Sequence, residues 1–129
     1  MPAPPWRGVG IGAGLVASVV LGFVTCLASA VVHREAVFAG GIAVFPYGLL
    51  LALATTWSVG KAMRDVFGAA GGICVVVGWL TTLSWLLLGR PEGDFVVAND
   101  SLGWGLLAGG VIVLGWLVAS SVARTGDRD

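Results

Sequence analysis

The sequence predicts an all-α membrane protein with four antiparallel transmembrane helices and with both the N- and C-termini in the cytoplasm. Three observations lead to this fold class. Seven Lys or Arg and seven Asp or Glu residues all fall outside four long apolar blocks. Only 11% of residues are charged, against about a quarter in a soluble domain, and the mean hydropathy is +0.97. The basic residues are also distributed unequally between the gaps that separate the blocks.

Each of the four charge-free blocks is long enough to cross a membrane as a helix. About 20 apolar residues, at a rise of 1.5 Å each, cross the ~30 Å hydrocarbon core of a bilayer. No gap between the blocks is long enough for a separate soluble core, so residues 1–129 are predicted to form one four-helix bundle. The predicted spans are 8–32, 36–60, 67–88 and 102–123.

The first span raises the alternative of a cleaved signal peptide. Ala28-Ser29-Ala30 has the small-residue pattern that precedes a signal-peptidase site, and cleavage after Ala30 would leave three spans. The uncharged run before it is longer than the ~7–15 residues of a signal peptide, and only Arg7 precedes it. We therefore favour a retained first span.

The second predicted span contains a proline. Pro46 lacks the donor N–H, and its ring clashes with the preceding turn of a helix, so a kink is predicted beside Tyr47. A packed bend is the simpler interpretation, because neighbouring groups in a membrane bundle can satisfy the freed carbonyl. The alternative is a hinge or a break that lines a pore.

Small residues recur at every fourth position within the spans, which places them along one side of each helix. Lipid tails are as apolar as Leu, so membrane helices associate through close backbone approach rather than through hydrophobicity. We predict that these small-residue faces are packing surfaces, either inside the bundle or against another subunit. The predicted helix-packing residues are Gly10, Gly14, Ser18, Gly22, Gly48, Ala52, Ala70, Gly78, Gly105 and Gly109.

The orientation follows from the basic residues, because Lys and Arg near span ends are retained in the cytoplasm. Arg34 and Arg90 lie on one side of the predicted bundle. The opposite side, which includes both tails, carries Arg7, Lys61, Arg64, Arg124 and Arg128. Both termini are therefore predicted to be cytoplasmic, in a multi-pass protein of the cell (plasma) membrane.

The residues that could perform chemistry are few. His33 is the single histidine, and Cys26 and Cys74 differ in predicted depth by roughly 15 Å, which argues against a disulfide between them. The sequence contains no phosphate-binding loop, nucleophile elbow or zinc-protease motif. We therefore expect no enzymatic activity, no cofactor and no metal site, and the zero net charge gives no indication of nucleic-acid binding.

The loop between the third and fourth spans is the longest polar stretch. Its spacing of acidic residues does not match a calcium-binding loop, and Asp100 is a candidate cap for the fourth helix. We predict a contact surface for a partner there. The candidate residues are Arg90, Glu92, Asp94, Asn99 and Asp100.

The stretch Gly89-Arg90-Pro91-Glu92-Gly93-Asp94, together with the four-span layout, resembles a family of small actinobacterial four-span integral membrane proteins of unknown function. The resemblance extends over nearly the whole chain but depends on this one motif. It implies the membrane fold and no particular activity.

The sequence thus predicts a non-catalytic accessory or scaffolding subunit that lies in the lipid bilayer. Its small-residue faces would pack against a membrane-protein partner or a second copy of the chain. The alternative is a small oligomeric channel or carrier for a neutral or weakly polar solute, which would use Pro46, Tyr47 and the Thr and Ser residues of the spans.

Overall fold

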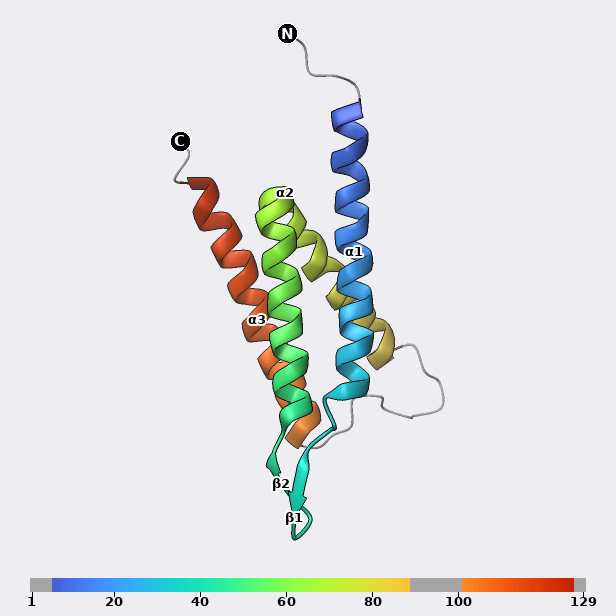
Figure 1. The fold of residues 1–129 in the computed structure, drawn as a ribbon, viewed down its shortest axis with the longest axis vertical. Coiled ribbons are helices and arrows are strands. Elements are labelled where there is room, and N and C mark those ends of the chain that lie inside the picture. The colour runs from blue at the N-terminus through green and yellow to red at the C-terminus, as the bar shows by residue number, and fades with distance from the viewer. Residues whose placement is uncertain (1–5, 89–100, 127–129) are drawn as a thin grey trace.

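The computed structural model describes residues 6–88 and 101–126, and these residues form three helices and one β-hairpin (Figure 1). All three helices are long and apolar enough to cross a membrane, so the chain has the character of a multi-pass membrane protein. The elements in chain order are α1 (Trp6–Val32), β1 (Val37–Ala39), β2 (Ile42–Phe45), α2 (Tyr47–Leu88) and α3 (Ser101–Gly126).

α1 and α3 follow the first and fourth predicted spans, whereas α2 covers most of the second and third. α2 has 42 residues, and as a straight helix it would be about 63 Å long, roughly twice the hydrocarbon core. Figure 1 shows that it instead turns at its upper end and runs back behind α1. We call residues 47–67 its first limb and residues 69–88 its second limb.

The turn of α2 is made by one glycine. Gly68 has φ 71° and ψ −161°, a backbone conformation that is essentially restricted to glycine. The predicted loop at residues 61–66 is therefore wrong, since these residues are helical and belong to the first limb. The backbone conformation of Gly68 reverses the chain at a single residue, so no separate loop is needed.

The predicted span 36–60 is wrong at its start, because residues 37–45 form a β-hairpin. Gly40 and Gly41 have φ values of 60° and 81°, and such positive angles at both central residues define the two-residue turn that suits a hairpin. The strands pair antiparallel with Ala39 opposite Ile42, and their β-branched and aromatic side chains favour extended backbone.

Pro46 does not kink a helix, contrary to the prediction. It lies directly before α2, and its carbonyl accepts a hydrogen bond from Leu50 N at 3.1 Å. Its missing N–H is harmless there, because the first N–H groups of a helix have no partner within the helix. The base of the hairpin is closed by Gly48 N, which donates to the Glu35 carbonyl at 2.8 Å, and by the Tyr47 hydroxyl, which donates to Glu35 Oε2 at 3.0 Å.

α2 is the central element, since α1 and α3 each pack against it. The first limb of α2 lies between α1 and α3 in Figure 1. Trp79 of the second limb is only 1% exposed and shares the core with Cys26 of α1 and with Leu106, Leu114 and Leu117 of α3.

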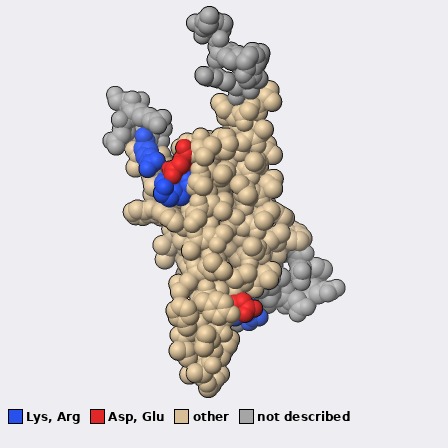
Figure 2. All heavy atoms as spheres, viewed as in Figure 1, with Lys and Arg blue, Asp and Glu red and all other residues tan. Residues whose placement is uncertain are grey.

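The outer surface of the helices is apolar. Val111, Ile112 and Trp116 of α3 are each more than 60% exposed, a pattern that suits hydrocarbon rather than water. On the face drawn in Figure 2, the coloured charged side chains form two groups, one beside the upper ends of α2 and α3 and one above the hairpin, with an uncharged body between them. The charge pattern of the sequence thus becomes a pattern along the length of the molecule.

Candidate functional site

A close reciprocal helix contact joins α1 to the second limb of α2. A Cβ atom at Gly22 would stand within 3.0 Å of the Val75 carbonyl, and a Cβ at Gly78 would stand equally near the Val19 carbonyl. The two backbones therefore touch with no side chain between them. We call this reciprocal contact the Gly22–Gly78 crossing; it allows the dispersion contacts and weak Cα–H···O bonds that hold membrane helices together.

Other predicted packing residues also have a neighbour at the position where a Cβ would project. Gly14 meets the Phe67 ring, Gly48 the Val32 carbonyl, Gly105 the Leu49 side chain and Gly109 the Leu53 side chain. Ser18 and Ala52 are buried, with 0% and 3% exposure. The structure therefore uses most of the predicted small-residue set for contacts between elements of this same chain.

Gly10 and Ala70 are exceptions. Both are exposed, and a Cβ at Gly10 would meet no atom within 4 Å. A spacing of four residues drifts by about 40° per step on a helix of 3.6 residues per turn. Over the two steps from Gly78 to Ala70 the stripe therefore leaves the contact face. The first turns of α1, which include Gly10, also project beyond the other helices in Figure 1.

The buried hydroxyls of the spans donate to their own helix. Thr56 Oγ1 donates to the Ala52 carbonyl at 2.9 Å, and Thr82 Oγ1 donates to the Gly78 carbonyl at 2.8 Å. Ser18 makes the same bond, to the Gly14 carbonyl at 2.8 Å. These protons are committed to the backbone, which leaves the hydroxyls little capacity to line a polar path for a solute.

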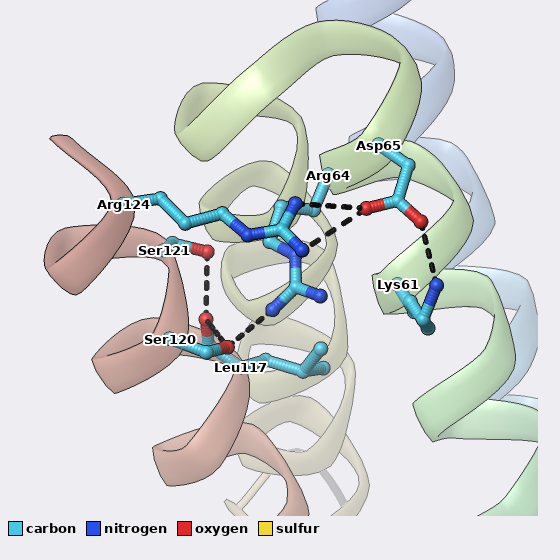
Figure 3. A network of polar contacts seen from close by, with 7 residues as sticks. All are labelled: Lys61, Arg64, Asp65, Leu117, Ser120, Ser121 and Arg124. Atoms are coloured by element: carbon cyan, nitrogen blue, oxygen red, sulfur yellow. Dashed lines mark hydrogen bonds and ion pairs between the residues drawn. The ribbon is translucent and has the colours of Figure 1, made fainter. Parts of the chain in front are cut away.

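A polar cluster lies at the end of the molecule where α2 turns and α3 ends (Figure 3). Lys61 Nζ is 2.7 Å from Asp65 Oδ2, and Arg124 of α3 brings its Nη1 within 3.4 Å of Asp65 Oδ1. Arg64 Nε lies 3.8 Å from the same Oδ1. Three cations thus share one carboxylate, and we call Lys61, Arg64, Asp65 and Arg124 the basic cluster.

Arg64 is the buried member of the basic cluster, with 7% exposure. Its Nη1 donates to Ser120 Oγ on α3, and Ser120 Oγ donates in turn to the Leu117 carbonyl at 3.2 Å. The directions agree, because a hydroxyl can donate one hydrogen bond while it accepts another. Arg64 Nε makes no hydrogen bond within the described residues. Arg64 therefore links α2 to α3 while one of its buried donors stays unsatisfied.

A cavity of about 710 Å³ opens beside the basic cluster. Arg64 and Arg124 contribute its charged wall, and Gly68 and Ala69 contribute backbone from the turn of α2. The remaining lining residues are Asp65, Val66, Phe67 and Ser121.

The sequence interpretation used Lys61, Arg64 and Arg124 for orientation alone and missed their association. The spacing of Lys61 and Asp65, four residues apart on a helix, is a readable signal for a pair. Arg124 and Ser120 lie more than fifty residues further along the chain, so their arrival at Asp65 and Arg64 depends on how the helices pack.

At the opposite end His33 is fully buried. Its Nδ1 lies 2.9 Å from the Ala30 carbonyl; since a carbonyl only accepts, Nδ1 carries the proton and donates. His33 therefore satisfies a carbonyl in the last turn of α1 that the helix leaves free. Its Nε2 is buried without a hydrogen-bond partner in the described part of the chain.

The predicted contact residues Arg90, Glu92, Asp94, Asn99 and Asp100 lie outside the described residues. Within residues 6–88 and 101–126, no three His, Cys, Asp or Glu side chains come together as metal ligands do. Cys26 and Cys74 are both free thiols.

The fold and these contacts define a class: a helical protein with the character of a multi-pass membrane protein and a cluster of charged residues at one end. The chain matches no protein-family model, no curated protein sequence and no solved structure.

Proposed function

We propose that this chain is a non-catalytic accessory or scaffolding subunit of the cell membrane. In this proposal it crosses the bilayer four times, through α1, the two limbs of α2, and α3. Each limb has about 20 residues, the length that one crossing requires. The cytoplasmic placement of both termini is supported by Lys61, Arg64 and Arg124, which lie at the end of the molecule where α1 begins and α3 ends (Figures 1 and 3).

The observation that carries the proposal is a face of α3 that holds three small residues and that no other described element covers. Ala108, Gly115 and Ala119 are exposed and lie on one side of the helix, together with the larger Ile112. A Cβ at Gly115 would meet no atom within 4 Å, in contrast to Gly105 and Gly109 on the same helix. We call these four residues the open face of α3.

A glycine within a helix costs about 1 kcal/mol relative to alanine, and at Gly115 no contact among the described residues offsets that cost. Close approach of a second helix would do so, because small residues let membrane helices pack backbone against backbone. A second copy of the chain or another membrane protein with a similar face would fit. The open face therefore favours a role in assembly.

Co-purification from native membranes in a mild detergent, followed by measurement of the mass of the complex, tests the proposal. We expect the wild-type chain to carry a stoichiometric partner or a second copy. Gly115→Leu should weaken that association about tenfold or more, since a bulky side chain separates closely packed helices. Val16→Phe is the matched control, because Val16 is 65% exposed on α1, away from the open face, and the added bulk there should leave the complex intact.

A monomer with no stoichiometric partner would contradict the proposal, as would an unchanged complex in Gly115→Leu. Flux of a neutral solute into liposomes that contain this protein alone would instead favour the channel or carrier.

A further inference from the structure

The cavity beside the basic cluster carries more positive than negative charge. Arg64 and Arg124 line it, and Asp65 is the single carboxylate on its described wall. Lys61 does not line the cavity but pairs with Asp65. The two oxygens of Asp65 are shared at 2.7, 3.4 and 3.8 Å, so at least two of the three cations lack a full counter-charge within the cluster. An anion in the cavity would supply the missing charge.

Arg64 is the residue that indicates which kind of group the cavity would bind. It is 7% exposed, it lines the cavity, and its Nε has no hydrogen-bond partner in the described residues. A buried donor without a partner costs about 1–3 kcal/mol, so this position calls for an acceptor. Ser120 already holds the other end of the guanidinium by accepting from Nη1, and this contact fixes the side chain in place.

The turn of α2 forms part of the cavity wall, where Gly68 and Ala69 contribute backbone. The first limb of α2 ends there and the second limb begins there, so the opposite ends of two helix dipoles meet and largely cancel. The positive charge of the cavity wall therefore comes from its arginine side chains.

The position and size of the cavity restrict the ligand further. It lies where α2 turns and where α3 ends, the level at which lipid headgroups meet a membrane protein, and Val66 and Phe67 add apolar walls. Its volume of about 710 Å³ falls within the range of sites for small organic molecules. Arg is also the side chain best matched to phosphate oxygens, which it contacts with two parallel N–H groups.

We propose that this cavity binds a phosphate group, held by Arg64 and Arg124. The phosphate belongs either to the headgroup of an anionic phospholipid or to a soluble phosphate compound. Asp65 acts as an internal competitor, since its carboxylate occupies the same cations when the cavity is empty. This inference does not depend on the open face of α3 or on a protein partner.

Two binding measurements on the full chain, stripped of lipid in a neutral detergent, distinguish the two sources. Native mass spectrometry compares phosphatidylglycerol with phosphatidylcholine of the same acyl chains. Calorimetry measures binding of inorganic phosphate and of glycerol phosphate. Preference for phosphatidylglycerol without binding of the soluble compounds identifies a lipid site, and the reverse identifies a soluble ligand.

The variants show whether binding occurs in this cavity. Arg124→Gln should weaken binding about five- to tenfold, because one charge-assisted contact is lost while an exposed side chain leaves the fold unchanged. Arg34→Gln removes the same charge at the other end of the molecule and should bind as the wild type does. Asp65→Asn should bind more tightly, because it removes the internal competitor.

Arg64→Lys tests the buried residue while it preserves the charge. It should lose affinity if the planar guanidinium contacts the phosphate, and circular dichroism should show the helices still formed. Equal affinity for phosphatidylglycerol and phosphatidylcholine, with no binding of the soluble phosphates, would overturn the proposal. Equal losses in Arg124→Gln and Arg34→Gln would overturn it too, since they would show attraction to overall charge instead of a site.

Discussion

At Gly22 and Gly78 a hydrogen atom in place of a side chain lets two backbones meet. Each glycine faces a carbonyl of the opposite helix, at a separation that a Cβ atom would not permit. In hydrocarbon such contacts are the main attraction between apolar helices, because lipid and Leu are equally apolar. Gly10 makes no such contact, because no helix in the described part of the chain lies opposite it. Whether a glycine contributes to helix packing thus depends on what lies opposite it.

Gly22→Leu should separate α1 from the second limb of α2. We expect a loss of about 1–3 kcal/mol in the free energy of unfolding, the usual cost of overpacking. The measurement is unfolding of the detergent-solubilised protein in a denaturing detergent, followed by tryptophan fluorescence.

Val20→Leu is the control for this variant, because Val20 is 53% exposed on the same helix and its enlargement meets lipid or detergent. Its stability should stay within ~0.5 kcal/mol of the wild type. Equal losses in the two variants would show that the Gly22–Gly78 crossing does not hold α1 in place.

Among the elements, α2 departs most from the sequence expectation. The helix reverses its direction at Gly68. It begins at Tyr47 and not at residue 36, because the hairpin occupies residues 37–45. The Gly-Gly pair between β-branched residues is a readable hairpin signal. The charge-free block that contains this pair is also long enough for a span, and its hydropathy alone predicts the span 36–60. Local turn chemistry and overall hydropathy competed here, and the turn chemistry prevailed.

Gly68→Ala should destabilise the protein although a Cβ there meets no atom within 4 Å. The cost arises from the backbone, since φ 71° with ψ −161° is unfavourable for any residue with a side chain, by about 1–3 kcal/mol. The same unfolding assay measures it.

Gly115→Ala provides a control of opposite sign. Gly115 also has open space around it, but it lies within a regular helix, where alanine is favoured by about 0.5–1 kcal/mol. If Gly68→Ala were as stable as Gly115→Ala, the turn of α2 would not require the glycine conformation.

For the whole molecule, the charged ends and the apolar body define how it lies in a membrane. Figure 2 shows the uncharged body, and the helices that form it expose large apolar side chains along their length. The basic cluster, the start of α1 and the end of α3 share one end of the molecule, and the hairpin occupies the other. A bilayer that covers the body leaves these two ends in water on opposite sides.

Cysteine labelling with a membrane-impermeant reagent tests this arrangement, in a background with Cys26 and Cys74 replaced by alanine. Lys61→Cys should react from the cytoplasmic side only and Ile42→Cys from the outside only, as the asymmetry of basic residues requires. Labelling at the reverse sides would overturn the orientation. Protection of Ile42→Cys from both sides would show that the hairpin is immersed in the bilayer.

Part of the candidate site was readable from the sequence. Most of the predicted packing residues were found in contacts, because small residues spaced by four positions must share a helix face. Gly10 and Ala70 were not, since the pattern does not tell where a neighbouring helix ends. The basic cluster was missed, because Arg64 and Ser120 are 56 positions apart and meet only through packing of α2 against α3.

The sequence by itself determined which segments are apolar over the length of a membrane-spanning helix and that every charge lies outside them. This pattern is clear because the transfer of a charged side chain into hydrocarbon is costly. Only the tertiary structure decided which small faces are filled and which remain open, where α2 turns, and that Arg64 is buried beside a cavity. The composition of each segment determines whether that segment is more stable in water or in hydrocarbon. Contacts between distant segments depend on the relative rotation and tilt of helices, and periodicity does not specify either of these.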